Sequence, residues 1–326
     1  MTPKPLCNLL VAAGAPEGGI YAYTLFRDGT LTQTAVTPLP SPMFLCRVGK
    51  KVAVIVRSFL PGTLRGGLYT ADVREDGGLD GFSEGVSTEG DCACHVCETG
   101  GRLYVANYLS GSIFSPGLPL LQGEGHGPNL PRQDGPHAHC VLPAPGGRFL
   151  LCTDLGLDRV RVCTPDLREV GGASVPAGHG ARHLCFSPEG DLVYCVNELA
   201  ATVTVFRWEE PHLTPLQTVS CGVNFSAHPE NLAAAIRVQG AFLYVSQRGE
   251  DSLTVFCREK DGLRRVGAYP TGGNAPRDFC LTEDGAFALC CCMGSSLLTV
   301  LPLRDGIPQP AVSSASLPSP LCVLCL

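Results

Sequence analysis

The stretch Val193–Phe206, which reads VYCVNELAATVTVF, decides the fold because it is one copy of a pattern that recurs along the chain. An apolar run ends at the polar residue Asn197, a short turn follows, and Thr202–Phe206 then alternates polar and apolar side chains. Alternation with a period of two residues is typical of β-strands that are buried on one face. The stretch therefore predicts two consecutive strands joined by a hairpin.

Both strands of this hairpin recur elsewhere in the 326-residue chain. The apolar run has six further copies, of which the first two are divergent: Leu9–Ala13, Val52–Val56, Leu103–Asn107, Leu150–Asp154, Leu243–Gln247 and Ala288–Cys292. The alternating strand has four: Ser112–Phe114, Arg159–Val162, Ser252–Phe256 and Leu297–Val300. The chain thus carries seven related units.

A further strand precedes each apolar run, and these seven strands are anchored near Phe44, His95, His139, His183, Leu232, Asp278 and Cys322. A repeat of roughly 40 to 50 residues with several short strands is typical of a β-propeller. The 39 glycines and 27 prolines also favour short strands and tight turns. We therefore predict an all-β, seven-bladed β-propeller that forms a single domain over residues 1–326.

The two ends of the chain predict how the ring closes. The sequence begins in the middle of a unit, whereas Pro320–Cys325 reads as the first strand of one. A blade built from both termini leaves no open sheet edge. We expect the C-terminal strand to lie innermost in the blade completed by residues 7–35.

Composition narrows the classes of partner. A net charge of -6 argues against nucleic acid or an anionic membrane surface as the main partner. A secretory signal and an apolar run long enough to cross a bilayer are both missing, so we expect a cytoplasmic protein. Most of the 18 cysteines lie within apolar strands and are expected to be free thiols. Cys322–Cys325 repeats the CxxC spacing of Cys94–Cys97, but a matched pair with turn residues between the ligands is missing, so we expect neither a metal nor another cofactor.

The first strands carry the residues that depart from a packing role. In a propeller these strands line the central channel, where packing alone calls for small or apolar side chains. The repeat instead holds His95, His139, His183 and Asp278 there, preceded in two copies by Arg182 and Arg277. We expect these side chains to converge on one pocket.

Two further stretches add polar groups. Arg132–His139, RQDGPHAH, brings a guanidinium, an amide, a carboxylate and two imidazoles together, and His137 and His139 share one face if the segment is extended. The apolar runs end at polar residues such as Asp154 and Asn197, which turns favour. Glu198 and Arg248 also follow apolar runs but are not preferred turn residues, which points to function. Histidine can move protons near neutral pH, and arginine binds carboxylates, phosphates and oxyanions.

Motifs for other chemistries are absent from the sequence. It contains no GxSxG elbow, no P-loop lysine motif, no HExxH and no dinucleotide fingerprint. Acyl-enzyme chemistry and nucleotide-driven chemistry are therefore disfavoured.

Five motifs in order and at blade spacing resemble the seven-bladed propeller lactonases, a family that includes bacterial propeller-type 6-phosphogluconolactonases and fungal carboxy-cis,cis-muconate cyclases. They lie at Arg132–His139, Thr153–Arg159, Gly178–Pro188, Val196–Leu199 and Ala275–Phe279. Three positions depart from the family pattern: Ala181 stands where proline is common, and Gln247 and Cys292 end strands where asparagine is expected.

The resemblance implies a metal-independent site at the channel mouth that acts on a lactone ring. The implied catalytic residues are His137 or His139, Arg182, Glu198 and Arg248. The residues expected to contact substrate are Arg132, Gln133, His95, His183, Asp154, Asn197, Arg277 and Asp278.

The expected reaction is hydrolysis of a sugar lactone, above all of 6-phosphogluconolactone in the pentose phosphate route of glucose metabolism. His137 by preference, or Glu198, takes a proton from water, and Arg182 stabilises the oxyanion. Arg248, Arg277 or Arg132 holds the phosphate. Two alternatives remain open: a cyclase or hydrolase for a muconate-type lactone, and a propeller that only binds a ligand or protein. The oligomeric state is also open.

Overall fold

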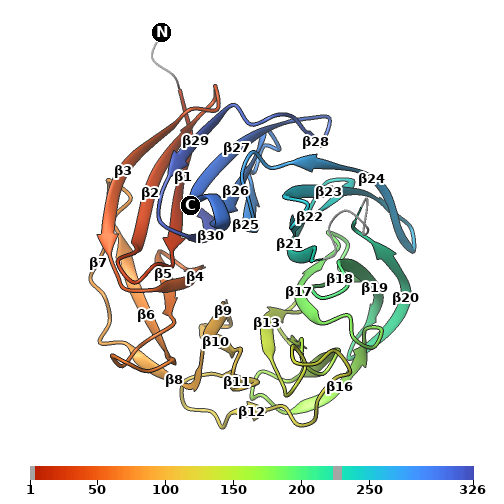
Figure 1. The fold of residues 1–326 in the computed structure, drawn as a ribbon. Coiled ribbons are helices and arrows are strands. Elements are labelled where there is room, and N and C mark those ends of the chain that lie inside the picture. The colour runs from red at the N-terminus through yellow and green to blue at the C-terminus, as the bar shows by residue number, and fades with distance from the viewer. Residues whose placement is uncertain (1–3, 223–229) are drawn as a thin grey trace.

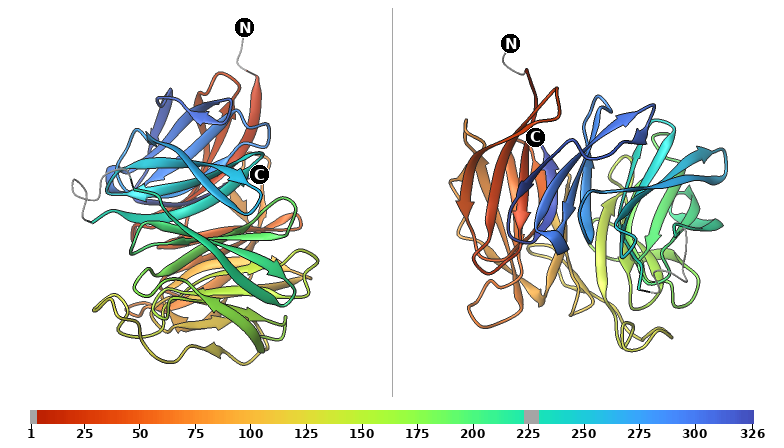
Figure 2. Two further views of the ribbon diagram at one scale, coloured as in Figure 1. Left: turned by 90° about the vertical axis from the view of Figure 1, so that its right-hand side faces the viewer. Right: turned by 45° about the horizontal axis from the view of Figure 1, so that its top comes forward.

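The protein is a ring of seven antiparallel sheets around a central channel, as the computed structural model shows for residues 4–222 and 230–326 (Figure 1). Figure 2 shows the ring from two other sides, with the first and last strands of the chain together in one sheet. The predicted all-β, seven-bladed propeller is confirmed. No helix within the described ranges is long and apolar enough to cross a membrane.

The seven blades are numbered here in chain order. Blade 1 holds β1 (Pro5–Ala13), β2 (Gly19–Phe26), β3 (Leu31–Pro38) and β30 (Pro320–Cys325). Blade 2 holds β4 (Pro42–Val48), β5 (Lys51–Val56), β6 (Arg65–Val73), β7 (Leu79–Asp80) and β8 (Val86–Asp91). Blade 3 holds β9 (Ala93–Thr99), β10 (Arg102–Asn107), β11 (Ser112–Phe114) and β12 (Leu121–Gln122).

Blades 4 to 7 continue the pattern. Blade 4 holds β13 (Ala138–Pro143), β14 (Leu150–Asp154), β15 (Arg159–Cys163) and β16 (Glu169–Ser174). Blade 5 holds β17 (Ala181–Phe186), β18 (Leu192–Asn197), β19 (Thr202–Glu209) and β20 (His212–Ser220). Blade 6 holds β21 (Leu232–Gln239), β22 (Phe242–Arg248), β23 (Ser252–Glu259) and β24 (Gly262–Pro270). Blade 7 holds β25 (Pro276–Leu281), β26 (Phe287–Cys292), the 3-10 turn Met293–Ser295, β27 (Leu297–Arg304), β28 (Ile307–Pro308) and β29 (Ser313–Ser316).

The ring closes as the sequence predicts. The C-terminal strand β30 pairs with β1 and is the innermost strand of blade 1. It also contacts β25 and β4, the innermost strands of the two neighbouring blades. β30 thus covers the inner side of β1, and the inner edges that remain in the seven blades are short and face one another around the ring, which is how propellers protect their sheets.

The core lies between neighbouring blades, where apolar side chains of facing sheets pack together. Between blades 5 and 6, for example, Tyr194 and Val205 pack with Val245 and Phe256, all fully buried. The 18 cysteines are all free, and most are buried within the strands, where thiols pack as small apolar groups.

The innermost strands begin with an irregularity that the sequence repeat conceals. In blades 2, 3, 4, 5, 7 and 1 the register with the second strand slips by one residue, which leaves one extra residue in a β-bulge. The extra residues are Met43, Cys94, His139, Arg182, Arg277 and Leu321. Bulges of this kind redirect a side chain and are frequent beside active sites.

The bulge corrects one sequence alignment. The prediction placed His139 in the same repeat position as His95 and His183. In the structure His139 is the extra residue of its bulge, as Arg182 is in blade 5. His95 and His183 each lie one residue further along the strand, opposite Ala106 and Val196. A one-residue slip moves a side chain to the other face of a strand, so His139 and His95 face different surroundings.

Candidate active site

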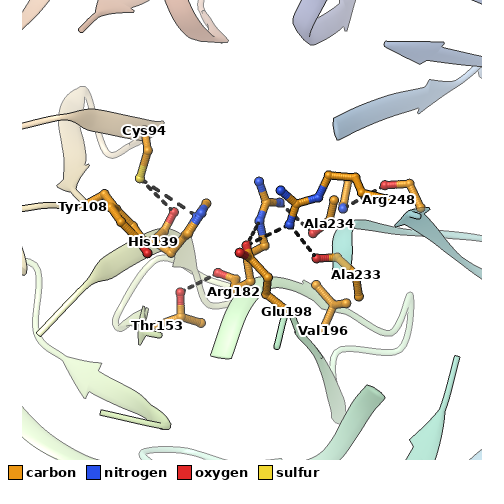
Figure 3. A network of polar contacts seen from close by, with 12 residues as sticks. Cys94, Tyr108, His139, Thr153, Arg182, Val196, Glu198, Ala233, Ala234 and Arg248 are labelled. Atoms are coloured by element: carbon orange, nitrogen blue, oxygen red, sulfur yellow. Dashed lines mark hydrogen bonds and ion pairs between the residues drawn. The ribbon is translucent and has the colours of Figure 1, made fainter. Parts of the chain in front are cut away.

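A cavity of about 320 Å³ lies where the bulges of the inner strands meet the ends of the second strands. Figure 3 shows the polar network at its wall. The residues that line it are Cys92, Cys94, Tyr108, Arg132, His139, Glu198, Leu232, Arg248 and Arg277. The structure thus brings together five of the residues predicted from the sequence: Arg132, His139, Glu198, Arg248 and Arg277.

Glu198 is the centre of the network. Its backbone N–H donates to the carbonyl of Gly180 at 2.7 Å, which fixes the side chain at the end of β18. Arg132 Nη2 donates to Oε1 at 2.6 Å, and Arg182 Nε donates to Oε2 at 2.9 Å. Arg248 Nη2 lies 3.0 Å from the same Oε2 (Figure 3). One buried carboxylate is therefore shared by three guanidinium groups.

The charges around Glu198 determine its protonation state. Burial on its own raises the pKa of this carboxyl group, but Arg248, Arg182, His139 and Arg132 outweigh burial and hold the pKa well below its usual range. Glu198 is therefore a carboxylate at neutral pH. A carboxylate with so low a pKa is a weak base, so the geometry favours a role in holding the arginines.

Arg182 lies behind the cavity and does not line it. Its side chain is 3% exposed, and Nη1 donates to the carbonyl of Ala234 at 2.6 Å. Burial, and then the nearby guanidinium of Arg248, lower the pKa of Arg182, whereas Glu198 raises it. The pairing with Glu198 is what stabilises this buried cation.

His139 is the imidazole at the cavity wall. Its Nδ1 lies 3.9 Å from the thiol sulfur of Cys94, and that thiol also donates to the carbonyl of His139 at 3.5 Å. Within the described ranges, Nε2 has no hydrogen-bond partner. Burial, with Arg182 as the next cause, lowers the pKa of His139 well below 6.5. The ring is therefore neutral at pH 7. Its lowered pKa makes it a weaker base than a free imidazole, but unlike Glu198 it keeps at the cavity a polar atom without a hydrogen-bond partner in the described structure.

His137 stands behind the wall. Its ring stacks on Tyr108 with centroids 4.6 Å apart and planes 11° from parallel. Nδ1 lies 3.1 Å from the Tyr108 carbonyl oxygen, and Nε2 lies 3.2 Å from Asp134 Oδ1. The sequence left the choice between the two histidines open and preferred His137. The structure places His139 at the cavity and His137 against the back of Tyr108.

Three of the expected substrate contacts hold loops instead. Gln133 Nε2 donates to the carbonyl of Leu155 at 2.8 Å. Asp154 Oδ1 accepts the backbone N–H of His137 at 2.8 Å. Asn197 Nδ2 donates to the hydroxyls of Thr202 and Thr204, each at 2.9 Å. These polar side chains do not line the cavity; they satisfy the turns that position it.

The remaining three predicted contacts, His95, His183 and Asp278, also do not line the cavity. The rings of His95 and His183 meet edge to face at 5.3 Å, and His183 lies 5.2 Å from His139. Asp278 Oδ1 lies 2.8 Å from Arg237 Nη2, and its Oδ2 accepts the backbone N–H of Val323 in β30. Asp278 thus ties the closing strand to blade 7.

The sequence prediction missed the cavity residues Cys92, Cys94, Tyr108 and Leu232. A usable signal existed for Tyr108. It follows Asn107 directly, as Glu198 follows Asn197 and Arg248 follows Gln247. Its hydroxyl accepts a hydrogen bond from Arg132 Nη2 at 3.3 Å. The position directly after the residue that ends each apolar run is called here the strand-end position. It therefore reaches the cavity from three blades.

No group of His, Cys, Asp and Glu side chains in the part of the chain that the structure describes is placed to hold a metal ion. What the cavity offers is a neutral imidazole beside several guanidinium groups. Such a set can move a proton at an electrophilic carbon while it stabilises negative charge.

Solved structures share this architecture over nearly the whole chain. The periplasmic gluconolactonase PpgL of Pseudomonas aeruginosa is 26% identical, with a TM-score of 0.90, and the match covers 98% of this chain and 99% of that one. A Bacteroides uniformis protein provisionally assigned as a 6-phosphogluconolactonase is 27% identical, with a TM-score of 0.88 and the same coverage.

Relatives found by sequence include proteins without an assigned function. A protein of Lactococcus lactis subsp. lactis is 34% identical over 68% of this chain and 73% of its own length. A Staphylococcus saprophyticus protein is 31% identical, and the chain matches only 56% of its length. The family model for the lactonase with a seven-bladed β-propeller matches residues 10–325. The chain therefore belongs to the seven-bladed β-propeller lactonase family.

Proposed function

We propose that the protein hydrolyses a lactone that carries an anionic group, with 6-phosphogluconolactone as the preferred substrate. One observation carries the proposal: a neutral imidazole, His139, faces the same cavity as the guanidiniums of Arg132, Arg248 and Arg277, while Glu198 supplies the one carboxylate among the lining residues described. Family membership and the names of the Pseudomonas and Bacteroides structures support lactone chemistry.

In the proposed mechanism His139 is the general base and then the general acid. Nε2 takes a proton from water as the water oxygen attacks the lactone carbonyl carbon. The tetrahedral intermediate collapses by breaking the bond between that carbon and the ring oxygen, and protonated His139 gives its proton to the leaving oxygen. The product is an open hydroxy acid, and the imidazole is neutral again.

Arg248 is the better candidate for the oxyanion, because it lines the cavity and Arg182 does not. Removal of one oxyanion donor typically lowers the rate by about 100-fold or more. Arg182 acts through Glu198, whose carboxylate it orients from behind. Glu198 in turn fixes the direction of Arg248 and Arg132, so that their charges are in place before substrate binds.

The test is hydrolysis of freshly prepared 6-phosphoglucono-δ-lactone, glucono-δ-lactone and a muconate-type lactone by purified protein, with a chelator present and spontaneous opening subtracted. We expect the phosphorylated lactone to be the best substrate. His139→Gln should abolish most of the rate, and the matched control His212→Gln, at an exposed position, should not change it. If the muconate-type lactone is preferred, the proposed sugar substrate is wrong and that lactone takes its place. If none of the three lactones is hydrolysed, the lactonase proposal fails in favour of a binding function.

The compartment is part of the same proposal. The 18 free cysteines support a reducing environment such as the cytoplasm, because partly exposed thiols oxidise outside it. In this proposal the protein acts on its pentose phosphate substrate in the cytoplasm.

A further inference from the structure

Two arginines near the cavity have no acid to pair with. Arg277, the bulge residue of blade 7, lines the cavity, and its guanidinium has no hydrogen bond or ion pair with any residue in the described ranges. Arg57 is the other, and its Nε is buried without a hydrogen-bond partner. A buried guanidinium without an acceptor is costly, so such a pair points to an anion supplied from outside.

The repeat explains where Arg57 lies. It follows Val56 directly, at the strand-end position of blade 2, which is the position of Tyr108, Glu198 and Arg248 in their blades. Its backbone N–H donates to the carbonyl of Ser41 at 3.0 Å, just as the N–H of Tyr108 donates to Cys92. The same position reaches the cavity in those three blades.

The charges of Arg57 and Arg277 influence each other. Burial lowers the pKa of Arg277 most, Arg248 and Arg57 lower it further, and Glu198 and Cys94 raise it. Both Arg57 and Arg277 also act on the thiol of Cys92, which lines the cavity. Arg277 and Cys92 therefore line the cavity, and Arg57 approaches them from the strand-end position of blade 2.

The cavity thus has two halves. His139, Glu198 and Arg248 come from blades 4, 5 and 6, whereas Arg277 and Arg57 come from blades 7 and 2, on either side of blade 1. The bulge residues of blades 1 and 2 are apolar: Leu321 packs with Met43 and Met293.

We propose that Arg57 and Arg277 form a subsite for a phosphate group of the substrate, separate from the carbonyl carbon that water attacks with His139 as the base and Arg248 as the oxyanion donor. This inference rests on the proposed function, which it extends by assigning substrate preference to named residues. A phosphate dianion suits the subsite better than a single carboxylate, because two guanidiniums repel each other until about two negative charges lie between them. Arginine also matches phosphate geometry through paired donors.

The test measures binding separately from turnover. Calorimetry with 6-phosphogluconate and gluconate, the two hydrolysis products, needs no catalysis. Arg57→Gln and Arg277→Gln should each weaken 6-phosphogluconate about 10- to 100-fold, the range expected for a hydrogen bond to a charged group, and leave gluconate unchanged. Arg47→Gln is the control, because it removes the same charge at an exposed position near the end of β4. It should change the affinity for neither product.

Kinetics completes the test. For the phosphorylated lactone both cavity variants should raise KM with little change in kcat, and for the plain lactone neither constant should change. If arginine-dependent binding is found without hydrolysis, the subsite stands and the lactonase proposal fails. If hydrolysis is found with equal affinity for both products, or with variants that behave as Arg47→Gln does, the phosphate subsite is wrong.

Discussion

At the scale of single residues, the site depends on the Glu198 carboxylate. Three guanidiniums converge on it, and Arg182, itself 3% exposed, has no other acid partner in the described structure. Breaking a buried ion pair by removing one partner typically costs about 3–5 kcal/mol, far more than the loss of a pair at the surface. Glu198 is thus expected to matter for folding as well as for activity.

Glu198→Gln should therefore lower both stability and activity. The amide keeps the shape of the side chain but removes the charge that the arginines share, so we expect the free energy of unfolding to fall by about 3 kcal/mol or more. Urea denaturation and lactone hydrolysis measure the two effects. Glu169→Gln is the control. Glu169 lies on the outer strand β16, pairs with Arg159 and Arg161 of β15, and is 27% exposed. Equal stability of both variants would contradict the central role of Glu198.

The two histidines of Arg132–His139 should differ sharply. His139→Gln removes the proposed base and should lower kcat by about 100-fold or more, the usual contribution of general base catalysis. His137→Gln leaves the base in place and disturbs only the stacking on Tyr108 and the ring's contacts with the Tyr108 carbonyl and Asp134, so its effect should remain within about 10-fold. Steady-state kinetics on the preferred lactone decides the matter, and a larger loss for His137→Gln would reverse the assignment.

The residue types of the site could be predicted, but their partners could not. Glu198, Arg248 and Arg277 stand out because a charged residue in a strand repeat is unexpected, and Arg132 because it lies in the polar stretch Arg132–His139. The same two signals mark Asn197, Asp278 and Gln133, but their partners prove to be hydroxyls, Arg237 with a backbone N–H, and a backbone carbonyl. Sequence shows that a polar group is present, whereas only coordinates show whether protein atoms already satisfy it.

At the scale of the strand, the deciding feature is the bulge. Period-two alternation predicts strands well, because side chains on successive residues face opposite sides. It cannot predict a single extra residue, which shifts the register without changing composition. His139 was therefore aligned with His95 and His183, although Cys94 and Arg182 are its equivalents. The error is small in sequence, yet it separates cavity residues from channel residues.

The bulges also require unusual backbone angles. Two residues before the extra residue, Ser41, Cys92, Ala275 and Ser319 have φ between 48° and 60°. This left-handed region is costly for residues other than glycine. We expect Ala275→Gly to stabilise the protein by about 1 kcal/mol and Ala275→Val to destabilise it by more. Thermal denaturation measures both. As a control, Ala53→Gly, in the regular part of β5, should lower Tm because glycine weakens a strand.

At the scale of the whole molecule, the channel makes stability depend on pH. Burial, followed by Arg237 and Arg182, lowers the pKa of His95 to about 3. Burial and Arg182 lower the pKa of His139 and of His183 well below 6.5, and Arg237 contributes at His183. Below about pH 6.5 the unfolded chain binds protons that the folded chain does not. The free energy of unfolding therefore falls as pH falls, by about 1.4 kcal/mol per pH unit for each histidine.

Urea denaturation at pH 7.5, 6.0 and 5.0 tests this. We expect a loss approaching about 4 kcal/mol per pH unit below pH 6 for the wild type, if the three contributions add. His95→Phe removes one titrating group and places an aromatic ring beside Phe44, which contacts the His95 ring at 4.5 Å. Its slope should be about one third shallower. Identical slopes would mean that His95 does not remain neutral in the folded protein.

The closed ring has a consequence for synthesis of the chain. The inner edge of β1 can be covered only by β30, which lies about 300 residues further along. At roughly 5–20 residues per second, a ribosome needs about 15–60 s to make that distance. During this time the apolar strand Leu9–Ala13 of the nascent chain can pair with β2 but has an open inner edge. The blade that completes the propeller is thus also the place where chaperones or self-association would act on the newly made protein.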